Sequence, residues 1–227
     1  MSKQKSKLSR RRLLGMAAAA GGIVICGDER PVIAQESPSV VFTPSVILGP
    51  FYPQAKPVEH DRDLTIISGR KQRANGTLIY LTGQIRNLKG APVSGARVSV
   101  WQANTHGRYR HKSDPNPAPL DPNFQGYASQ VTDGEGRYHL KTIKPGAYPA
   151  PVVGMRSPHI HFEIEAKFDR LITQMFFPGE PLNGQDAFYQ FLKAPQRVAV
   201  LAKPAALPAG SEPDALAFKW DVVLISG

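Results

Sequence analysis

The sequence has almost no cysteine, and this scarcity excludes several kinds of chemistry. Cys26 is the only cysteine among 227 residues, and it lies in an N-terminal segment that we expect to be removed. The mature chain would then contain no disulfide, catalytic thiol, iron–sulfur cluster, cysteine-ligated zinc or covalently attached haem. With 41% hydrophobic residues, the chain has enough apolar side chains for a core that holds the fold without disulfides.

The N-terminal segment also lacks a hydrophobic run long enough to cross a membrane. The apolar run at residues 13–26 has 14 residues, whereas a membrane span needs ~20. It follows Ser9-Arg10-Arg11-Arg12-Leu13-Leu14-Gly15, which resembles a twin-arginine export motif, and Ala34 offers a small residue for cleavage before Gln35. We therefore expect residues 1–34 to direct export to the periplasm or the medium, with no stable membrane anchor. A basic cytosolic tail and an uncleaved anchor are the alternatives.

Acidic residues are few, but the basic excess is concentrated in this segment. The whole chain has 28 basic and 18 acidic residues, a net charge of +10. Residues 1–34 hold seven of the basic and two of the acidic groups, so the remainder carries a net +5. A surplus this small does not indicate a nucleic-acid partner, and we expect none.

Long helical patterns are lacking as well, and the 20 glycines and 21 prolines favour strands and loops. Residues 35–76 are expected to form an irregular N-terminal arm and residues 77–227 an all-β catalytic domain. Alternating hydrophobicity and turn signals predict an antiparallel β-sandwich with long loops. The expected strands are residues 77–86, 93–101, 126–132, 137–143, 159–166, 171–177, 197–202 and 215–225.

Two local features refine this expectation. The turn sequence Asp133-Gly134-Glu135-Gly136 predicts that residues 126–132 and 137–143 pair as a hairpin. Residues 186–192 are the best candidate for a short helix or turn.

The strongest local sign of chemistry is the sequence His159-Ile160-His161. On a strand, residues i and i+2 point to the same face, so both imidazoles are expected to lie together. Two neutral imidazoles on one face can form half of a transition-metal site. An isolated pattern of this kind is more often a hydrogen-bonded pair on a half-buried strand.

Two tyrosines in loops extend this pattern. Tyr148 lies 11 residues before His159, and Tyr109 lies 39 residues before Tyr148. A phenol, with a pKa of about 10, binds a metal when a strongly acidic cation removes its proton. Two tyrosinates and two imidazoles therefore suit a hard trivalent ion, with ferric iron the natural choice. Either tyrosine alone is more often a core or hydrogen-bonding residue.

Taken together, these residues lie in an ordered series of motifs that resembles the intradiol ring-cleavage dioxygenases, most closely the β-chain type of protocatechuate 3,4-dioxygenase. The resemblance covers roughly residues 45–180. The motifs are Gly49-Pro50-Phe51-Tyr52-Pro53, Val100-Trp101-Gln102-Ala103-Asn104, Gly107-Arg108-Tyr109-Arg110-His111, Leu120-Asp121-Pro122-Asn123-Phe124, Thr142-Ile143-Lys144-Pro145-Gly146-Ala147-Tyr148-Pro149 and Pro158-His159-Ile160-His161-Phe162.

The resemblance implies a site and a reaction. By the family pattern, a non-haem ferric ion would be bound by Tyr109, Tyr148, His159 and His161. The family pattern also gives a catalytic role to Tyr148, which would leave the metal as substrate binds. Two further catalytic residues are implied, Arg156 beside the substrate and Gln174 near the metal ligands.

The implied partners are a catecholic small molecule and O2, and the implied product is a cis,cis-muconate. Protocatechuate or a related catechol is the expected substrate. Residues 150–155, between Tyr148 and Arg156, look shorter and less aromatic than in typical protocatechuate enzymes, which leaves the particular catechol open. The family also assembles, so a homo-oligomer is expected without a fixed number of copies.

Two other functions are compatible with parts of the sequence. The pattern from Gly90 to Val98 also looks like carboxypeptidase-regulatory β-sandwich modules, which bind partners without catalysis. Such a module has no reason to keep both tyrosines and both histidines. A zinc or copper hydrolase is disfavoured, because no acidic residue stands at a familiar ligand spacing from the two histidines.

Overall fold

The computed structural model describes residues 41–54 and 61–226. The expected export signal at residues 1–34 lies outside the described residues, as do residues 35–40 and 55–60 of the arm. No helix in the described part of the chain is long and apolar enough to cross a membrane.

One sheet is organised around the ten-residue strand β1, Leu78–Asn87. β1 pairs antiparallel with β4 on one side, and parallel with β10 and then β11 on the other. β9 pairs with the far edge of β10. The bounds of the other strands are Arg137–Ile143 (β4), Lys203–Pro204 (β9), Leu216–Lys219 (β10) and Val222–Leu224 (β11).

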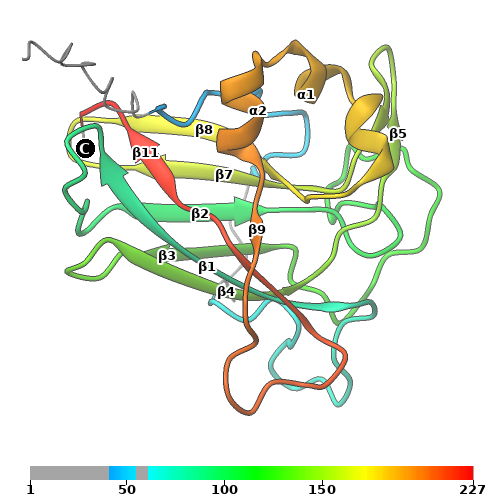
Figure 1. Ribbon diagram of the computed structural model, residues 1–227. Coiled ribbons are helices and arrows are strands. Elements are labelled where there is room, and N and C mark those ends of the chain that lie inside the picture. Colours follow the sequence, from blue (N-terminus) through cyan, green and yellow to red (C-terminus); the bar gives the residue numbers. More distant parts are fainter. Residues whose placement is uncertain (1–40, 55–60, 227) are drawn as a thin grey trace, which may run out of the picture. The chain divides into compact units, whose positions relative to one another are not determined.

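The second sheet is fully antiparallel and contains four strands in the order β3-β2-β7-β8. Figure 1 shows these strands side by side. A separate two-stranded ribbon, β5 with β6, lies before β7 in the chain. The bounds are Arg97–Trp101 (β2), Tyr127–Val131 (β3), Tyr148–Ala150 (β5), Gly154–Arg156 (β6), His159–Glu165 (β7) and Arg170–Phe176 (β8).

Alternation along β7 explains why the two sheets pack as a sandwich. Ile160, Phe162 and Ile164 are fully buried and belong to one core cluster with Leu81 and Ile85 of β1. Burying each such side chain stabilises the fold by ~1.5–3 kcal/mol relative to exposure. The all-β sandwich is therefore confirmed, and the residues between these positions face away from the core toward the loops and the arm.

The expected hairpin is wrong, although its turn forms. Asp133 accepts hydrogen bonds from the backbone N–H groups of Glu135 and Arg137, at 2.9 and 2.8 Å. The flanking strands separate after this turn, because β3 pairs with β2 and β4 pairs with β1 in the other sheet. Both strands direct apolar side chains into the same core from opposite sides, so the turn crosses between the two layers.

The expected strand at residues 197–202 is also wrong, because a helix, α2, occupies Ala194–Val200. Pro195 suits the first helical turn, and the Gln196 side chain accepts a hydrogen bond from the Lys193 N–H at 3.0 Å. The expected strand at 215–225 divides into β10 and β11.

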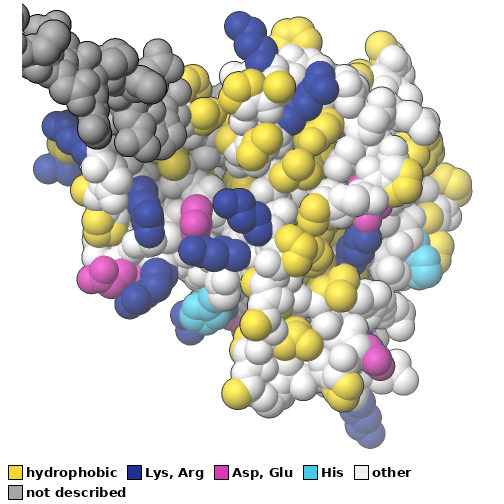
Figure 2. All heavy atoms as spheres, in the orientation of Figure 1, with side chains coloured by type: hydrophobic (Ala, Val, Ile, Leu, Met, Phe, Trp, Pro, Cys, Tyr) yellow, Lys and Arg dark blue, Asp and Glu magenta, His cyan; other side chains and the backbone are white. Residues whose placement is uncertain are grey.

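The short helix expected near residues 186–192 is present as α1, Ala187–Phe191, and a 3₁₀ turn, η1, covers Pro181–Gly184. In the view of Figure 2, hydrophobic side chains are exposed where α1 and α2 lie, consistent with the exposure of Phe191.

Candidate metal centre

Strand β7 delivers both histidines to one point on the outer face of its sheet. Each side chain is 2% exposed, and the two Nε2 atoms are 3.2 Å apart. Burial lowers the pKa of both imidazoles well below the ordinary value, and the nearby positive charge of Arg156 adds to this effect. Both rings are therefore neutral near pH 7 and can offer lone pairs to a metal.

The tautomer of His159 follows from its neighbour. Its Nδ1 lies 2.6 Å from the backbone oxygen of Ser157. Because a carbonyl oxygen only accepts, Nδ1 must carry the proton and donate it. The Nε2 lone pair of His159 is then directed toward His161, as expected of a metal-binding imidazole.

The two tyrosines reach the histidines from separate loops. The Tyr109 hydroxyl is 3.4 Å from His159 Nε2, and the Tyr109 and Tyr148 rings meet edge to face with centroids 5.4 Å apart. Both side chains are buried, at 3% and 5% exposure. Burial raises the pKa of Tyr109 well above the ordinary value and also raises the pKa of Tyr148. Deprotonating these phenols therefore requires a cation.

Gly107 allows the loops that carry the tyrosines to meet. It has φ +77°, and a Cβ built on it would lie 2.2 Å from the backbone oxygen of Ala147 and 3.0 Å from Tyr148 Cβ. Any other residue would therefore separate the two loops. The backbone N–H of Tyr109 also donates to Asp114 Oδ2 at 2.6 Å, which fixes the position of this loop.

This arrangement fits a metal ion. Two nitrogens ~2.1 Å from one ion and at about a right angle to it would be roughly 3 Å apart, close to the 3.2 Å observed between the Nε2 atoms. Among the described residues, no group of three or more histidine, cysteine or acidic side chains is placed to bind a metal. The remaining donors at this point are phenols, a set that favours a ferric ion over zinc.

Arg156 and Gln174, the two further residues singled out in the sequence, are hydrogen-bonded to each other near these groups. Arg156 is 3% exposed, and its Nη2 donates to Gln174 Oε1 at 2.6 Å. The Gln174 amide donates in turn to the backbone oxygen of Ile47 in the arm, at 2.9 Å. The pair thus provides a buried positive charge, with a fixed orientation, next to the two histidines and two tyrosines.

Asp186 is a site residue that the sequence reasoning missed. It is fully buried, and its Oδ2 accepts from Arg156 Nε and from the Ser157 backbone N–H, both at 2.9 Å. Its Oδ1 accepts from the Phe188 and Tyr189 N–H groups and begins α1. The only signal in the sequence was an aspartate placed to cap the expected helix.

The arm and strand β2 contribute a second group of residues that the sequence reasoning did not place in the site. Phe51 packs against Tyr109, with ring centroids 4.7 Å apart, and Tyr52 meets Trp101 edge to face. Trp101 stacks on His161 with a centroid separation of 4.8 Å and an interplanar angle of 12°. The available signal was that these three aromatic residues fall within the quoted motifs.

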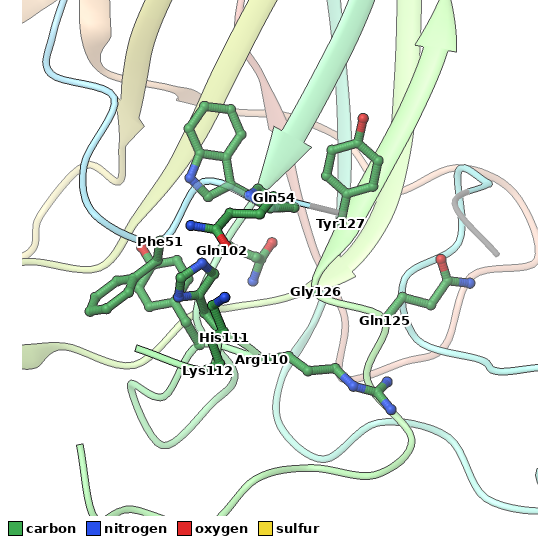
Figure 3. Close-up of a pocket in the computed structure, with 12 residues that line it drawn as sticks. Phe51, Gln54, Gln102, Arg110, His111, Lys112, Gln125, Gly126 and Tyr127 are labelled. Atoms are coloured by element: carbon green, nitrogen blue, oxygen red, sulfur yellow. The ribbon is translucent and has the colours of Figure 1, made fainter. Parts of the chain in front are cut away.

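A cavity of about 280 Å³ lies against Tyr109, Trp101 and Phe51. Figure 3 shows Phe51 and His111 close together on one side of it, with Gln125 on the other. Its lining does not include Tyr148, His159, Arg156 or Gln174. This cavity is therefore distinct from the face of the centre on which Arg156 lies.

Comparison with known proteins identifies the class. The family model described as "Dioxygenase" matches residues 47–226, so the chain belongs to this family. Together with its curated relatives, the family match defines the chain as an intradiol ring-cleaving dioxygenase, which confirms the resemblance seen in the sequence. They do not favour a non-catalytic binding module.

The protocatechuate 3,4-dioxygenase β chain of Burkholderia cepacia is 42% identical over 72% of this chain and 71% of its own length. The catechol 1,2-dioxygenase of Candida albicans is 29% identical over 74% of this chain, and the hydroxyquinol 1,2-dioxygenase of a Rhizobium species is 31% identical over 64%. The matches span only 59% and 51% of these two longer relatives.

A solved structure has the same fold. The dioxygenase domain of a carbohydrate-binding fusion protein from Streptomyces sp. SirexAA-E matches 82% of this chain and all of its own, with 26% identity and a TM-score of 0.62.

Proposed function

We propose that this chain is a non-haem iron dioxygenase that uses O2 to cleave a catechol between its two hydroxylated carbons, giving a cis,cis-muconate. The observation that supports this most is the convergence of two neutral imidazoles and two buried phenols within hydrogen-bonding or ring-contact distance. We assign Tyr109, Tyr148, His159 and His161 as the ligands of a ferric ion. When bound, this ion would supply the Lewis acidity and redox chemistry that make a catechol reactive toward O2.

The protein's own groups would handle protons and charge. Tyr148 and Arg156 are directly paired in the β5–β6 register, which places the phenol and the guanidinium on neighbouring strands. The Tyr148 oxygen, which is one of the proposed metal ligands, would accept a proton from the incoming catechol. The Arg156 guanidinium, held by Asp186 and Gln174, would stabilise negative charge that develops on the substrate.

The proposed substrate is protocatechuate or a related catechol. The 42% identity to a protocatechuate 3,4-dioxygenase β chain supports protocatechuate as the first compound to test. The short turn between β5 and β6 is the segment through which substrate preference would differ.

The test is the iron content and visible spectrum of the purified protein, before and after anaerobic addition of catechol or protocatechuate. We expect one iron per chain, with a tyrosinate-to-iron absorption band that shifts on addition of substrate. Admitting O2 should then yield a muconate that mass spectrometry detects. A protein that stays colourless after ferrous loading in air would contradict the proposal.

A matched pair of variants tests the ligand assignment. Tyr109→Phe removes a proposed ligand, whereas Tyr138→Phe removes an equally buried phenol that hydrogen-bonds to the Trp220 backbone oxygen at 2.7 Å, in the core. We expect loss or displacement of the absorption band in Tyr109→Phe and an unchanged band in Tyr138→Phe. The same change in both would reject the assignment.

We further propose that the mature protein acts after twin-arginine export, in the periplasm or the medium. The Arg10-Arg11 pair and the weakly hydrophobic run after it support this. Replacing both arginines by lysine should retain the protein in the cytoplasm, as measured by cell fractionation. Assembly into a homo-oligomer stays a prediction, which light scattering of the purified protein would test.

A further inference from the structure

His161 differs from His159 in how its ring is held. His159 donates through Nδ1 to the Ser157 oxygen, whereas His161 Nδ1 is buried and has no hydrogen-bond partner among the described residues. A metal-binding histidine almost always donates its second N–H to a group that fixes the ring orientation. Something other than a hydrogen bond must therefore orient the His161 ring.

Packing supplies this orientation. The Trp101 indole is nearly parallel to the His161 ring, at a 12° interplanar angle. Gly49 comes close to its edge, since a Cβ built on this residue would lie 3.1 Å from His161 Cε1. The Trp101 indole is also in an edge-to-face contact with Tyr52, with ring centroids 5.0 Å apart. His161 thus lies against Trp101 of strand β2 and Gly49 of the arm, and Tyr52 of the arm contacts the same indole.

The arm segment is fixed in turn by a buried carboxylate. Glu163 follows His161 by two residues on β7 and shares its face, and its side chain is 3% exposed. Its Oε2 accepts from the Tyr52 hydroxyl at 2.7 Å, and its Oε1 accepts from Arg170 Nε and Nη2 at 2.9 and 2.6 Å. Both carboxylate oxygens are therefore occupied, and a buried carboxylate satisfied in this way holds its partners firmly.

We propose that Tyr52 and Glu163 are positioning residues for His161, acting through Trp101 in place of the hydrogen bond that His161 Nδ1 lacks. This inference rests on the proposed function, in which His161 binds iron. Neither residue touches the metal-binding atoms. Their effect is to keep the arm and the indole against the imidazole, so that Nε2 points at the ion.

The primary test compares Tyr52→Phe with Tyr80→Phe. The Tyr80 hydroxyl donates to Glu212 at 2.6 Å and is also partly buried, but it lies on β1 in the other sheet. Each variant loses one phenol-to-carboxylate hydrogen bond and keeps its ring. We expect release of iron to a chelator to be about tenfold faster in Tyr52→Phe, the lower end of the range for losing groups that orient metal ligands, and unchanged in Tyr80→Phe.

Two further measurements separate positioning from general stability. The electron paramagnetic resonance spectrum of the ferric site should change in Tyr52→Phe and not in Tyr80→Phe, even if both lower the Tm equally. Glu163→Gln should also speed iron release, because its amide oxygen stays toward Arg170 and the Tyr52 hydroxyl exchanges a charge-assisted bond to a carboxylate for a weaker bond from the amide NH2. The double variant should release iron no faster than the faster single variant, since both changes remove the same interaction.

The outcomes distinguish the two proposals. A parent protein that takes up no iron overturns the proposed function, and this inference with it. A parent that holds iron, with Tyr52→Phe and Glu163→Gln matching Tyr80→Phe in release rate and spectrum, overturns this inference alone.

Discussion

Replacement of Asp186 by asparagine is the sharpest test of how the centre is held together. The Asp186 carboxylate joins the candidate centre to helix α1. Its Oδ2 accepts hydrogen bonds from Arg156 and Ser157, and its Oδ1 accepts hydrogen bonds from the first N–H groups of α1. Asparagine caps a helix about as well as aspartate, so its oxygen can keep the α1 side. Its NH2 group then faces Arg156 Nε and the Ser157 N–H, which are both donors.

The magnitude follows from the burial of this ion pair. Arg156 and Asp186 have 4% and 0% of their side-chain surfaces exposed, so the variant leaves a buried guanidinium without its counter-charge. Removing one partner of a buried ion pair costs ~3–5 kcal/mol. For a domain of this size, each kcal/mol lowers Tm by about 2–4 °C, and we therefore expect Tm to fall by roughly 6–20 °C.

Thermal unfolding followed by circular dichroism measures this change, and Asp133→Asn provides the control. Asp133 also accepts two backbone N–H bonds and an arginine Nε bond, from Arg137 at 2.8 Å, but on the surface. Because exposed ion pairs contribute little, this variant should unfold close to the parent Tm. Equal Tm values for Asp186→Asn and Asp133→Asn would refute the reasoning.

Three further outcomes are expected. Tyr148→Phe should keep iron but change its colour and slow anaerobic catechol binding in stopped-flow experiments; unchanged colour and kinetics would reject its role as a ligand that substrate displaces. Val152 is exposed at the tip of the β5–β6 turn and has φ +73°. Replacing it by glycine should raise the free energy of unfolding by about 1 kcal/mol, since left-handed geometry costs a residue with a side chain ~1–2 kcal/mol. A Tm that does not rise would show that this turn is unstrained. Hydrogen bonds from Lys141 and Tyr80 lower the pKa of Glu212 to about 2. The stability from this cluster is fully present above the ordinary pKa of 4.5 and is lost as the pH falls toward 2, so Glu212→Gln should show a smaller fall in Tm over this interval.

The sandwich could be predicted from the sequence because its strands alternate clearly. Residues 159–166 place isoleucine and phenylalanine on one face and histidine on the other, and β7 forms there. The same reasoning failed at residues 197–202, where short apolar residues suit a strand or a helix and the preceding proline and packing decide for α2. It also failed at the turn before Arg137, because turn chemistry specifies a reversal and not the sheet in which the next strand pairs.

The candidate centre was predictable where local spacing determines geometry. The pairing of His159 with His161 follows from strand periodicity, whereas the approach of Tyr109 to Tyr148 depends on loop contacts that no periodicity encodes. The supporting acceptors were missed because their partners are remote in sequence, 111 residues apart for Tyr52 and Glu163. That the four side chains bind iron stays a prediction.

Strand β7 has a consequence for the quality of any protein preparation. Its core-facing residues alternate with the histidines of the candidate centre, so a slip of one residue would turn both imidazoles into the core and bring Ile160 and Phe162 to the centre. A mispaired strand would therefore be unable to hold an ion through both histidines. If iron binds at this centre as proposed, the iron content per chain would equal the fraction of molecules in which β7 has its native register. The colour of a sample would then measure how much of the protein is correctly folded.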